Sequence, residues 1–238
     1  MRPPGALLAA GRDAEIFEYG PHAVLRRARS GRSLALEART MAYVAAAGYP
    51  VPAVEEVSDD GSELVMERIV GPSMVAAIAR RPWRVRRFGA MLGDLHRRLH
   101  ELAAPPWLPA AGVGHGDAVV HLDLHPLNVM LGPRGPVVID WSNARRGDPA
   151  VDVALAWALL SAGEVEARGP VALITGWARR VLTDGFLAAV DRGAAAAVLA
   201  AVVAWKCADP NMSAAEQAGM RRLAATVAPA DPDPDPGR

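Results

Sequence analysis

Apolar and polar side chains alternate along much of the first 70 residues, and turn-forming residues interrupt this alternation at short intervals. A period of two is typical of strands that bury one face. The pattern predicts strands within residues 10–20, 22–28, 51–57 and 63–69, with turns at 20–21 and 59–61. Residues 33–47 have helical spacing instead, and Gly48 followed by two prolines ends that helix. The first part of the chain is therefore predicted to be a small antiparallel sheet with one helix.

After Gly71 the apolar side chains recur mainly every three or four residues, which is typical of amphipathic helices. The clearest helix covers residues 84–102, and short strands return within residues 119–142. Four more helices are predicted at residues 150–162, 171–192, 194–208 and 214–227. We therefore predict an α+β protein with two lobes and a tail. The β-rich lobe is residues 1–70, the mainly helical lobe is residues 71–229, and residues 230–238 form a disordered, acidic, proline-rich tail.

Composition narrows the class of protein. Hydrophobic residues make up 51% of the chain and charged residues 22%, as in globular proteins, and 26 basic residues balance 26 acidic ones. The chain thus lacks the basic excess of a general nucleic-acid binder. The longest apolar run, residues 194–205, is shorter than the roughly 20 residues that cross a membrane, and no signal peptide is recognisable. The single cysteine, Cys207, excludes an intramolecular disulfide and favours a reducing, cytoplasmic location.

The strongest chemical signal is the segment HLDLHPLN at residues 121–128, followed by Asp140 at the end of the apolar run VVID. Phosphoryl transfer from a nucleotide needs an acidic residue at the acceptor hydroxyl and oxygen ligands for Mg²⁺ on the phosphates. A tight loop places Asp123 and Asn128 together, and a pair of strands then returns the chain to Asn128 at Asp140. These residues have the types and the spacing that such a site requires.

The chain resembles the aminoglycoside phosphotransferase-like small-molecule kinases, which share the protein-kinase-like fold. The motifs that carry the resemblance are GRDAEI (11–16), VLRR (24–27), LHRRLH (95–100), HLDLHPLN (121–128), IDW (139–141) and GDPAVD (147–152). The resemblance implies a two-lobed kinase-like fold and an enzyme that uses Mg²⁺. That enzyme would move the γ-phosphate of ATP or GTP to a hydroxyl group of a small molecule, with antibiotics such as aminoglycosides and macrolides among the implied acceptors.

The same resemblance implies a role for each residue of the loop. Asp123 is the implied catalytic base or the group that orients the acceptor hydroxyl, and Asn128 and Asp140 are the implied Mg²⁺ ligands. His121 is implied to support the loop. Asp152 is implied to be a buried structural carboxylate that accepts hydrogen bonds from backbone N–H groups of the loop.

The nucleotide-binding lobe departs from the family pattern. Its third strand should supply a lysine to the nucleotide phosphates, but the only lysine of the chain is Lys206. Arg26 is the predicted replacement, with Glu37, the only acidic residue of the following helix, as its ion-pair partner. Arg27 is the competing candidate, because the alternation of a strand allows only one of the two neighbours to face inward.

Two further segments are implied to contact the nucleotide. Met66 borders the implied adenine pocket, and Glu67 and Arg68 offer backbone hydrogen bonds to the base. The turn GRDAEI has a single glycine, Gly11, so backbone N–H groups would supply its phosphate contacts.

Two other functions compete with the kinase. If residues 121–125 formed a straight strand, His121, Asp123 and His125 would share one face and could bind a catalytic metal in a metallohydrolase, although Pro126 follows at once. Alternatively, the absence of the lysine is compatible with a catalytically degenerate kinase fold that serves as a binding module.

The sequence leaves the acceptor open. His125 stands where protein kinases usually carry a phosphate-contacting lysine, which favours a small-molecule acceptor over a protein. The helical lobe offers scattered acidic residues and several tryptophans, which neither require nor exclude a cationic acceptor. The choice between ATP and GTP and the oligomeric state are also open.

Overall fold

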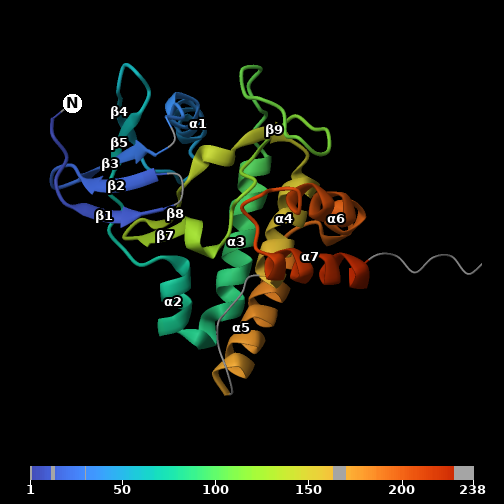
Figure 1. Cartoon of the computed structure of the whole chain (residues 1–238). Helices are drawn as coiled ribbons and strands as arrows, with labels where there is room; N and C mark the ends of the chain where they lie inside the picture. The colour runs from blue at the N-terminus through green and yellow to red at the C-terminus, as the bar shows by residue number, and fades with distance from the viewer. Residues whose placement is uncertain (1, 12–13, 30, 163–169, 228–238) are drawn as a thin grey trace, which may run out of the picture.

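The computed structural model describes residues 2–11, 14–29, 31–162 and 170–227 (Figure 1). Its N-terminal part is an antiparallel sheet of five strands in the order β1-β2-β3-β5-β4. The strands are β1 (Leu7–Ala10), β2 (Ala14–Glu18), β3 (Ala23–Ala28), β4 (Val54–Val57) and β5 (Glu63–Glu67), and the helix α1 (Ala35–Ala46) lies between β3 and β4 in the chain. Met41 and Val44 of α1 are buried in the same core as Met66 of β5. The predicted antiparallel sheet with one helix is thus confirmed.

The rest of the chain is mainly helical, with two short hairpin-like sheets that pair β6 with β9 and β7 with β8. The helices are α2 (Met74–Arg80), α3 (Val85–His100), α4 (Pro149–Ala162), α5 (Pro170–Leu187), α6 (Arg192–Lys206) and α7 (Ala214–Val227). The strands are β6 (Ala118–Val120), β7 (Val129–Gly132), β8 (Gly135–Val138) and β9 (Arg145–Gly147), and the 3₁₀ turns are η1 (Pro82–Arg84), η2 (Pro126–Asn128) and η3 (Trp141–Asn143). Helices α3, α5, α6 and α7 all pack on α4, whose side chains are almost all buried, and this explains its uniformly apolar sequence.

Helices α3 and α5 approach each other closely through glycines. A Cβ atom on Gly89 would lie 2.1 Å from the carbonyl oxygen of Leu182, and one on Gly185 would lie 2.4 Å from the carbonyl oxygen of Arg86. Only glycine allows two backbones to come this near. The contact holds α3 in the position from which its last residue, His100, reaches Asp152 of α4.

Within the described residues, no single helix is both long and apolar enough to cross a membrane. The pair Ile174–Leu187 and Arg192–Lys206 reaches the required length and composition only when taken together, and it is bent by 118°. The predicted tail at residues 230–238 lies outside the described residues, so its disorder stays a prediction.

Candidate active site

One buried carboxylate holds the start of the loop that joins β6 to β7. Asp152, in the first turn of α4, accepts hydrogen bonds from the backbone N–H groups of His121 (2.9 Å) and Leu122 (2.7 Å) and lies 3.0 Å from Nε2 of His100. Burial alone would raise the pKa of Asp152, but the hydrogen bond from His100, the nearby histidines and the backbone N–H bonds hold it below its ordinary value. Leu122 has a φ of 60°, a left-handed conformation that outside bonds of this kind can maintain. The predicted structural role of Asp152 is therefore confirmed.

Asp123 and Asn128 lie side by side in this loop. Nδ2 of Asn128 donates to the backbone carbonyl of Asp123 at 2.9 Å and to its Oδ2 at 3.1 Å. His125 contacts Oδ1 of the same carboxylate through Nε2 at 3.4 Å, and its Nδ1 accepts a hydrogen bond from the backbone N–H of Leu127. Because Nδ1 is an acceptor, the ring proton of a neutral His125 lies on Nε2, which faces Asp123. Both carboxylate oxygens of Asp123 are thus held in a fixed orientation.

The hairpin of β7 and β8 returns the chain to this loop at Asp140. Val129 pairs with Val138, and the backbone N–H of Ile139 donates to the carbonyl of Asn128 at 3.0 Å. Asp140 itself has a φ of 63°, an uncommon conformation for a residue other than glycine. Strain of this kind concentrates at functional sites. The antiparallel register thus places Asp140 beside Asn128, as the sequence predicts.

Arg26 and Arg27 face opposite sides of the sheet. Arg26, in β3, is only 7% exposed, and its Nη2 donates to Oδ1 of Asp140 at 2.8 Å while its Nε lies 3.5 Å from Oε2 of Glu37. Arg27 forms a 2.7 Å ion pair with Glu63. The predicted pairing of Arg26 with Glu37 is present, and the structure adds a direct bond between Arg26 and Asp140. The role of Arg26 toward phosphate stays a prediction.

Burial and charge act differently on the two carboxyl groups that contact Arg26. Burial raises the pKa of Glu37 to about 7, and the neighbouring charge of Arg26 only partly opposes this. Burial also acts to raise the pKa of Asp140, but the charge and hydrogen bond of Arg26 and the hydroxyl of Ser142 hold it below its ordinary value. The two carboxyl groups that contact Arg26 thus differ, because the pKa of Asp140 is lowered while that of Glu37 is raised.

This arrangement predicts a pH-dependent effect of Glu37→Gln on stability. The pKa of Glu37 in the folded state, about 7, lies above its ordinary value of 4.5, so the folded protein binds this proton more tightly than the unfolded chain. The resulting stabilisation is complete below pH 4.5 and is lost as the pH rises through 7. Glutamine cannot ionise, so the free energy of unfolding of the variant relative to wild type should rise with pH between these limits, by on the order of 3 kcal/mol. Urea unfolding at a series of pH values tests this, and parallel curves for the two proteins would contradict it.

Met66 and Arg68 flank the end of β5. Met66 lies on the same face of the sheet as Arg26, is 9% exposed and belongs to the main core. The backbone N–H of Glu67 donates to the carbonyl of Ala53 (2.8 Å), and that of Arg68 donates to the carbonyl of His22 (2.7 Å). The expected hydrogen bonds to a base are therefore restricted to the carbonyl groups of these two residues. The adenine roles of Met66 and Arg68 stay predictions.

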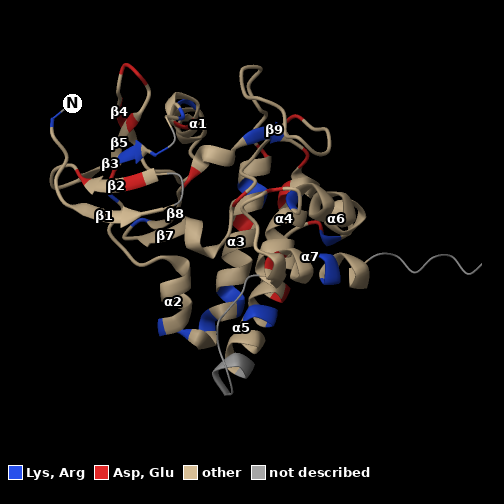
Figure 2. Ribbon diagram, in the orientation of Figure 1, with Lys and Arg blue, Asp and Glu red and all other residues tan. Residues whose placement is uncertain are grey.

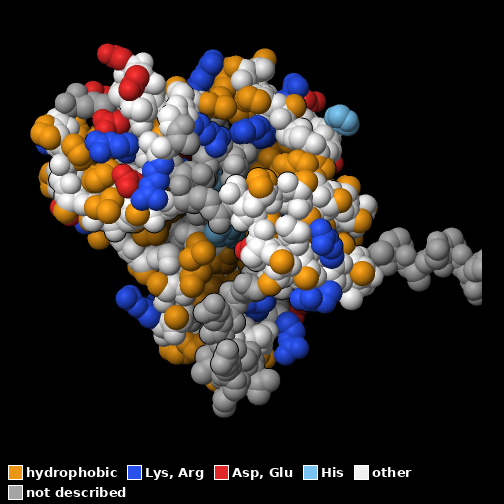
Figure 3. Space-filling view, viewed as in Figure 1, with side chains coloured by type: hydrophobic (Ala, Val, Ile, Leu, Met, Phe, Trp, Pro, Cys, Tyr) orange, Lys and Arg blue, Asp and Glu red, His pale blue; other side chains and the backbone are white. Residues whose placement is uncertain are grey.

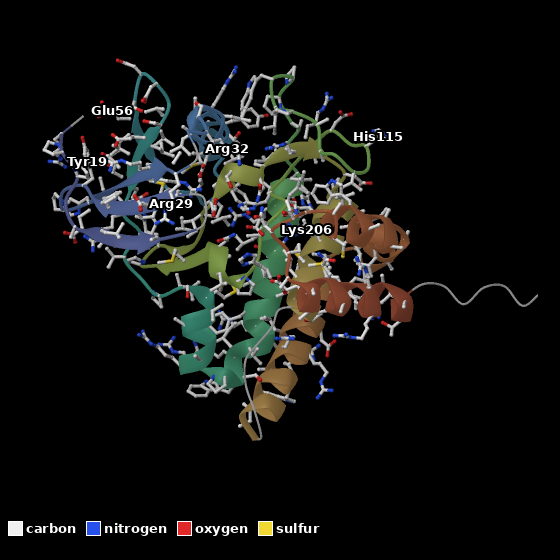
Figure 4. The ribbon with its side chains drawn as sticks, in the orientation of Figure 1. Tyr19, Arg29, Arg32, Glu56, His115 and Lys206 are labelled. Atoms are coloured by element: carbon white, nitrogen blue, oxygen red, sulfur yellow. The ribbon has the colours of Figure 1, made fainter. Side chains whose placement is uncertain are left out.

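Two residues of the site were missed in the sequence. Ser142 donates from Oγ to Oδ1 of Asp140 at 3.0 Å, and Arg32 donates to the carbonyl of Ser142 at 2.7 Å. Arg32, labelled beside α1 in Figure 4, lines a small cavity of about 60 Å³ together with Arg26, Glu37 and Ser142. In the sequence, only the position of Ser142 two residues after Asp140 could have indicated its contact with that carboxylate. Arg12 and Asp13, in the predicted phosphate-contacting turn, lie outside the described residues.

The geometry does not favour the metallohydrolase. The left-handed backbone of Leu122 breaks the strand that would have placed His121, Asp123 and His125 on one face. His121 is instead fully buried, with its ring 4.8 Å from that of Trp141, and burial lowers its pKa. Figure 4 places His115 at the outer edge of its loop, and Lys206 on α6 away from β3. Within the described part of the chain, no three His, Cys, Asp or Glu side chains form a cluster that could hold a metal.

Comparison with solved structures supports the kinase-like fold. An aminoglycoside-3'-phosphotransferase of type VIII is 20% identical, with 93% of each chain covered and a TM-score of 0.61. A choline/ethanolamine kinase family protein from Mesorhizobium loti is 15% identical over 95% of this chain and 88% of that chain, with a TM-score of 0.56. Amicoumacin kinase hAmiN, in complex with AMP-PNP, Ca²⁺ and Ami, is 15% identical over 93% of this chain and 87% of that chain, with a TM-score of 0.53.

The structural similarity over nearly the whole chain establishes the fold, and the predicted α+β kinase-like architecture is confirmed. No curated protein matches the chain. The sequence model of the phosphotransferase enzyme family, APH, matches residues 7–118 and 106–182, which together cover most of the chain. The chain therefore belongs to the APH phosphotransferase enzyme family.

Proposed function

We propose that this protein is a small-molecule kinase that transfers the γ-phosphate of ATP or GTP to a hydroxyl group of its acceptor. The observation that carries the proposal is the 2.8 Å ion pair between Arg26 and Asp140. This pair connects β3, the strand that we expect to bind phosphate, with Asp140 at the end of the β7–β8 hairpin, which starts beside Asn128. Groups expected at the nucleotide, at the metal and at the acceptor are thereby brought into one continuous site.

Asp123 is the proposed catalytic residue. Its side chain is 27% exposed, so an acceptor hydroxyl can reach it from solvent. The contacts from Asn128 and His125 fix the direction of the carboxylate before the acceptor arrives. From there it can accept a hydrogen bond from the hydroxyl and take its proton as the hydroxyl oxygen bonds to the γ-phosphorus. The bond from that phosphorus to the bridging oxygen then breaks, and ADP or GDP leaves.

The donor atoms beside Asp123 fit Mg²⁺. Asn128 uses its amide nitrogen for Asp123, which leaves its amide oxygen as the atom that could bind a cation, and Asp140 supplies a carboxylate. Mg²⁺ prefers oxygen ligands and is commonly held by one or two carboxylates together with substrate phosphates. When bound, the ion would neutralise negative charge on the phosphates. Arg26 shares Oδ1 of Asp140 with Ser142, so it is placed to exchange this contact for a phosphate oxygen.

Arg26→Ala should lower nucleotide affinity or the transfer rate by about ten- to hundredfold, the worth of a charge-assisted contact of roughly 1.5–3 kcal/mol. Arg27→Ala is the matched control, because Arg27 pairs with Glu63 at the surface, where such pairs contribute about 0–1 kcal/mol. Isothermal titration with Mg-ATP and steady-state kinetics measure both effects. Equal losses in the two variants would remove Arg26 from the phosphate site.

The function is tested with a panel of hydroxylated small molecules, including aminoglycosides, macrolides, choline, homoserine and sugars. Each is incubated with the purified protein, Mg²⁺, and ATP or GTP, and phosphorylated products are detected by mass spectrometry. Transfer to any member that disappears on chelation of Mg²⁺ supports the proposal. Tight Mg-nucleotide binding without turnover on any acceptor or on water would favour the degenerate binding module instead.

We further propose that the acceptor is a small hydroxylated molecule, with antibiotics of the aminoglycoside or macrolide type among the candidates, and that the protein acts in the cytoplasm. The named solved relatives support a small-molecule acceptor, since they are an aminoglycoside phosphotransferase, a choline/ethanolamine kinase family protein and an amicoumacin kinase. The single cysteine, Cys207, is compatible with a reducing compartment.

A further inference from the structure

A strongly basic surface lies on the side of the helical part that the active site does not use. Five of the eight residues from 80 to 87 are arginines, and no acidic residue occurs from 68 to 93. All five arginines are exposed, and the ribbon in Figure 2 is blue, the colour of Lys and Arg, at the end of α2 and the start of α3. Figure 3 shows blue side chains beside apolar surface at the lower left of the molecule.

Four of these arginines line a pocket of about 400 Å³ between α2, α3 and the hairpin of β7 and β8. We call this the arginine pocket, and its charged residues are Arg80, Arg81, Arg84 and Arg87. Its other lining residues are apolar or glycine, namely Pro72, Ala77, Phe88, Met91, Leu131, Gly132, Gly135 and Pro136. Among the described residues that line it, the pocket thus combines several cations with apolar side chains and has no acidic side chain.

No acidic side chain among the described residues balances the charges of the arginine pocket. Elsewhere on the surface, arginines form ion pairs, such as Arg27 with Glu63, Arg29 with Glu15 and Arg68 with Glu18. Within the described residues, none of the five arginines at 80–87 has an acidic partner. Clustered like charges repel one another, so an external anion would gain from several cations at once.

The position of two of the arginines also disfavours a structural role. Arg86 and Arg87 lie in the first turn of α3, a 16-residue helix with no acidic residue in that turn. The first turn carries the positive end of the helix dipole, where cations are unfavourable. The helix dipole therefore does not explain either arginine, and Arg87 is one of the four that line the pocket.

We propose that the arginine pocket binds an acidic linear segment of a partner protein, with an apolar side chain of that segment on the floor of the pocket. The positive charge of the pocket favours an acidic partner. The apolar surface of Phe88 and Met91 favours a partner that also carries an apolar side chain, which a free phosphate ion does not have. Trp83, which is 74% exposed between Arg81 and Arg84, extends the surface beyond the pocket. Tryptophan and arginine are enriched in the residues that dominate protein–protein binding energy.

A concave site is better matched to a peptide than to a bilayer. Phe88 is 7% exposed at the floor, below a rim of arginines, so a flat membrane would meet the rim without reaching the floor. The chain as a whole has a net charge of zero, because 26 acidic residues balance its 26 basic ones, which is unlike a general nucleic-acid binder.

The test uses a fluorescein-labelled heptapeptide of six aspartates around a central leucine, with fluorescence anisotropy as the readout. The full-length wild-type protein should bind it in low salt, and the same peptide with asparagines should not bind. The double variant Arg84→Gln/Arg87→Gln should weaken binding by roughly tenfold or more, since each lost pair is charge-assisted. The matched control Arg221→Gln/Arg222→Gln removes two exposed arginines from α7 and should change binding less than about twofold.

Three results would overturn the proposal. The first is no binding of the aspartate peptide in low salt, and the second is an equal loss in the two double variants. The third is tight binding to phosphatidylglycerol vesicles by wild type but not by Arg84→Gln/Arg87→Gln, with the peptide unbound, which would assign the surface to a membrane. Thermal unfolding separates binding from folding, because the Tm of Arg84→Gln/Arg87→Gln should stay unchanged or rise. Failure of the kinase assay would leave this proposal untouched, since no residue of the active site takes part in it.

Discussion

Asp123→Ala should lower the rate of phosphoryl transfer by roughly 10²–10⁴, the range that a positioned general base contributes. The carboxylate is held by Asn128 at 3.1 Å and by His125 at 3.4 Å, so its place is set before the acceptor binds. Asp123→Asn should show a similar loss, because an amide keeps the shape of the side chain but cannot take the hydroxyl proton. Steady-state kinetics with the acceptor found in the panel give kcat, and isothermal titration gives the affinity for Mg-nucleotide, which should change much less.

Asp117→Ala is the matched control for this prediction. The segment HGD at residues 115–117 imitates the start of a catalytic loop, but the residue five positions after Asp117 is Leu122 and not asparagine. The side chain of Asp117 is 92% exposed and lies 4.0 Å from Arg146. We expect its removal to leave the rate within about twofold, since exposed pairs contribute little. A rate for Asp123→Ala within tenfold of wild type, or an equal loss in Asp117→Ala, would overturn the assignment.

Asp152→Asn should lower the free energy of unfolding by about 3–5 kcal/mol, the cost of breaking a buried and hydrogen-bonded charge. Asp152 is 1% exposed, and its two carboxylate oxygens bond to two backbone N–H groups and to His100. Asparagine has only one side-chain oxygen, so its NH₂ group would face at least one of these N–H groups. Its pKa in the folded state lies below the ordinary value of 3.8. Its stabilisation is therefore present above pH 3.8 and is lost as the pH falls below it, so the variant should lose less stability in acid than wild type.

Urea unfolding at pH 7 and at acid pH measures this effect. Asp148→Asn is the control, because Asp148 lies just before α4 and caps the N–H of Ala150 at 2.8 Å, a role that asparagine fills equally well. We expect a change below about 1 kcal/mol there. If Asp152→Asn lowered the free energy of unfolding as little as the control does, the loop would not depend on this carboxylate. Loss of activity should accompany the loss of stability, since Leu122 keeps its left-handed backbone beside Asp123 only while its N–H is held.

Sequence reasoning was most successful where the chemistry is local. The spacing of HLDLHPLN is enough to place Asp123 and Asn128 together, because five residues in a tight loop cannot separate them. Strand alternation is enough to send Arg26 and Arg27 to opposite faces, and the scarcity of acidic residues in α1 leaves only Glu37 as an inward partner. Helix bounds were also predicted well, as for α3 at Val85–His100, because the apolar spacing there is regular.

Sequence reasoning failed where residues far apart in the chain decide the property. The bond between Arg26 and Asp140 joins positions 114 residues apart, and it follows from how the sheet packs against the hairpin. The proton affinity of Glu37 depends on its burial, and its pKa of about 7 cannot be read from its neighbours in the chain. The sequence shows the arginines at 80–87 only as a cluster of positive charge. They line a pocket only because the β7–β8 hairpin packs beside them and forms its other wall.

The sequence by itself thus determined the fold class, the family and the order of the reactive groups, because these depend on periodicity and on short, ordered motifs. The tertiary structure alone decided which charges meet, that the backbone N–H groups of Glu67 and Arg68 are already bonded within the protein, and that the pKa of Glu37 is raised. These properties depend on desolvation and on distances across the core, and both arise only when segments remote in the chain pack together.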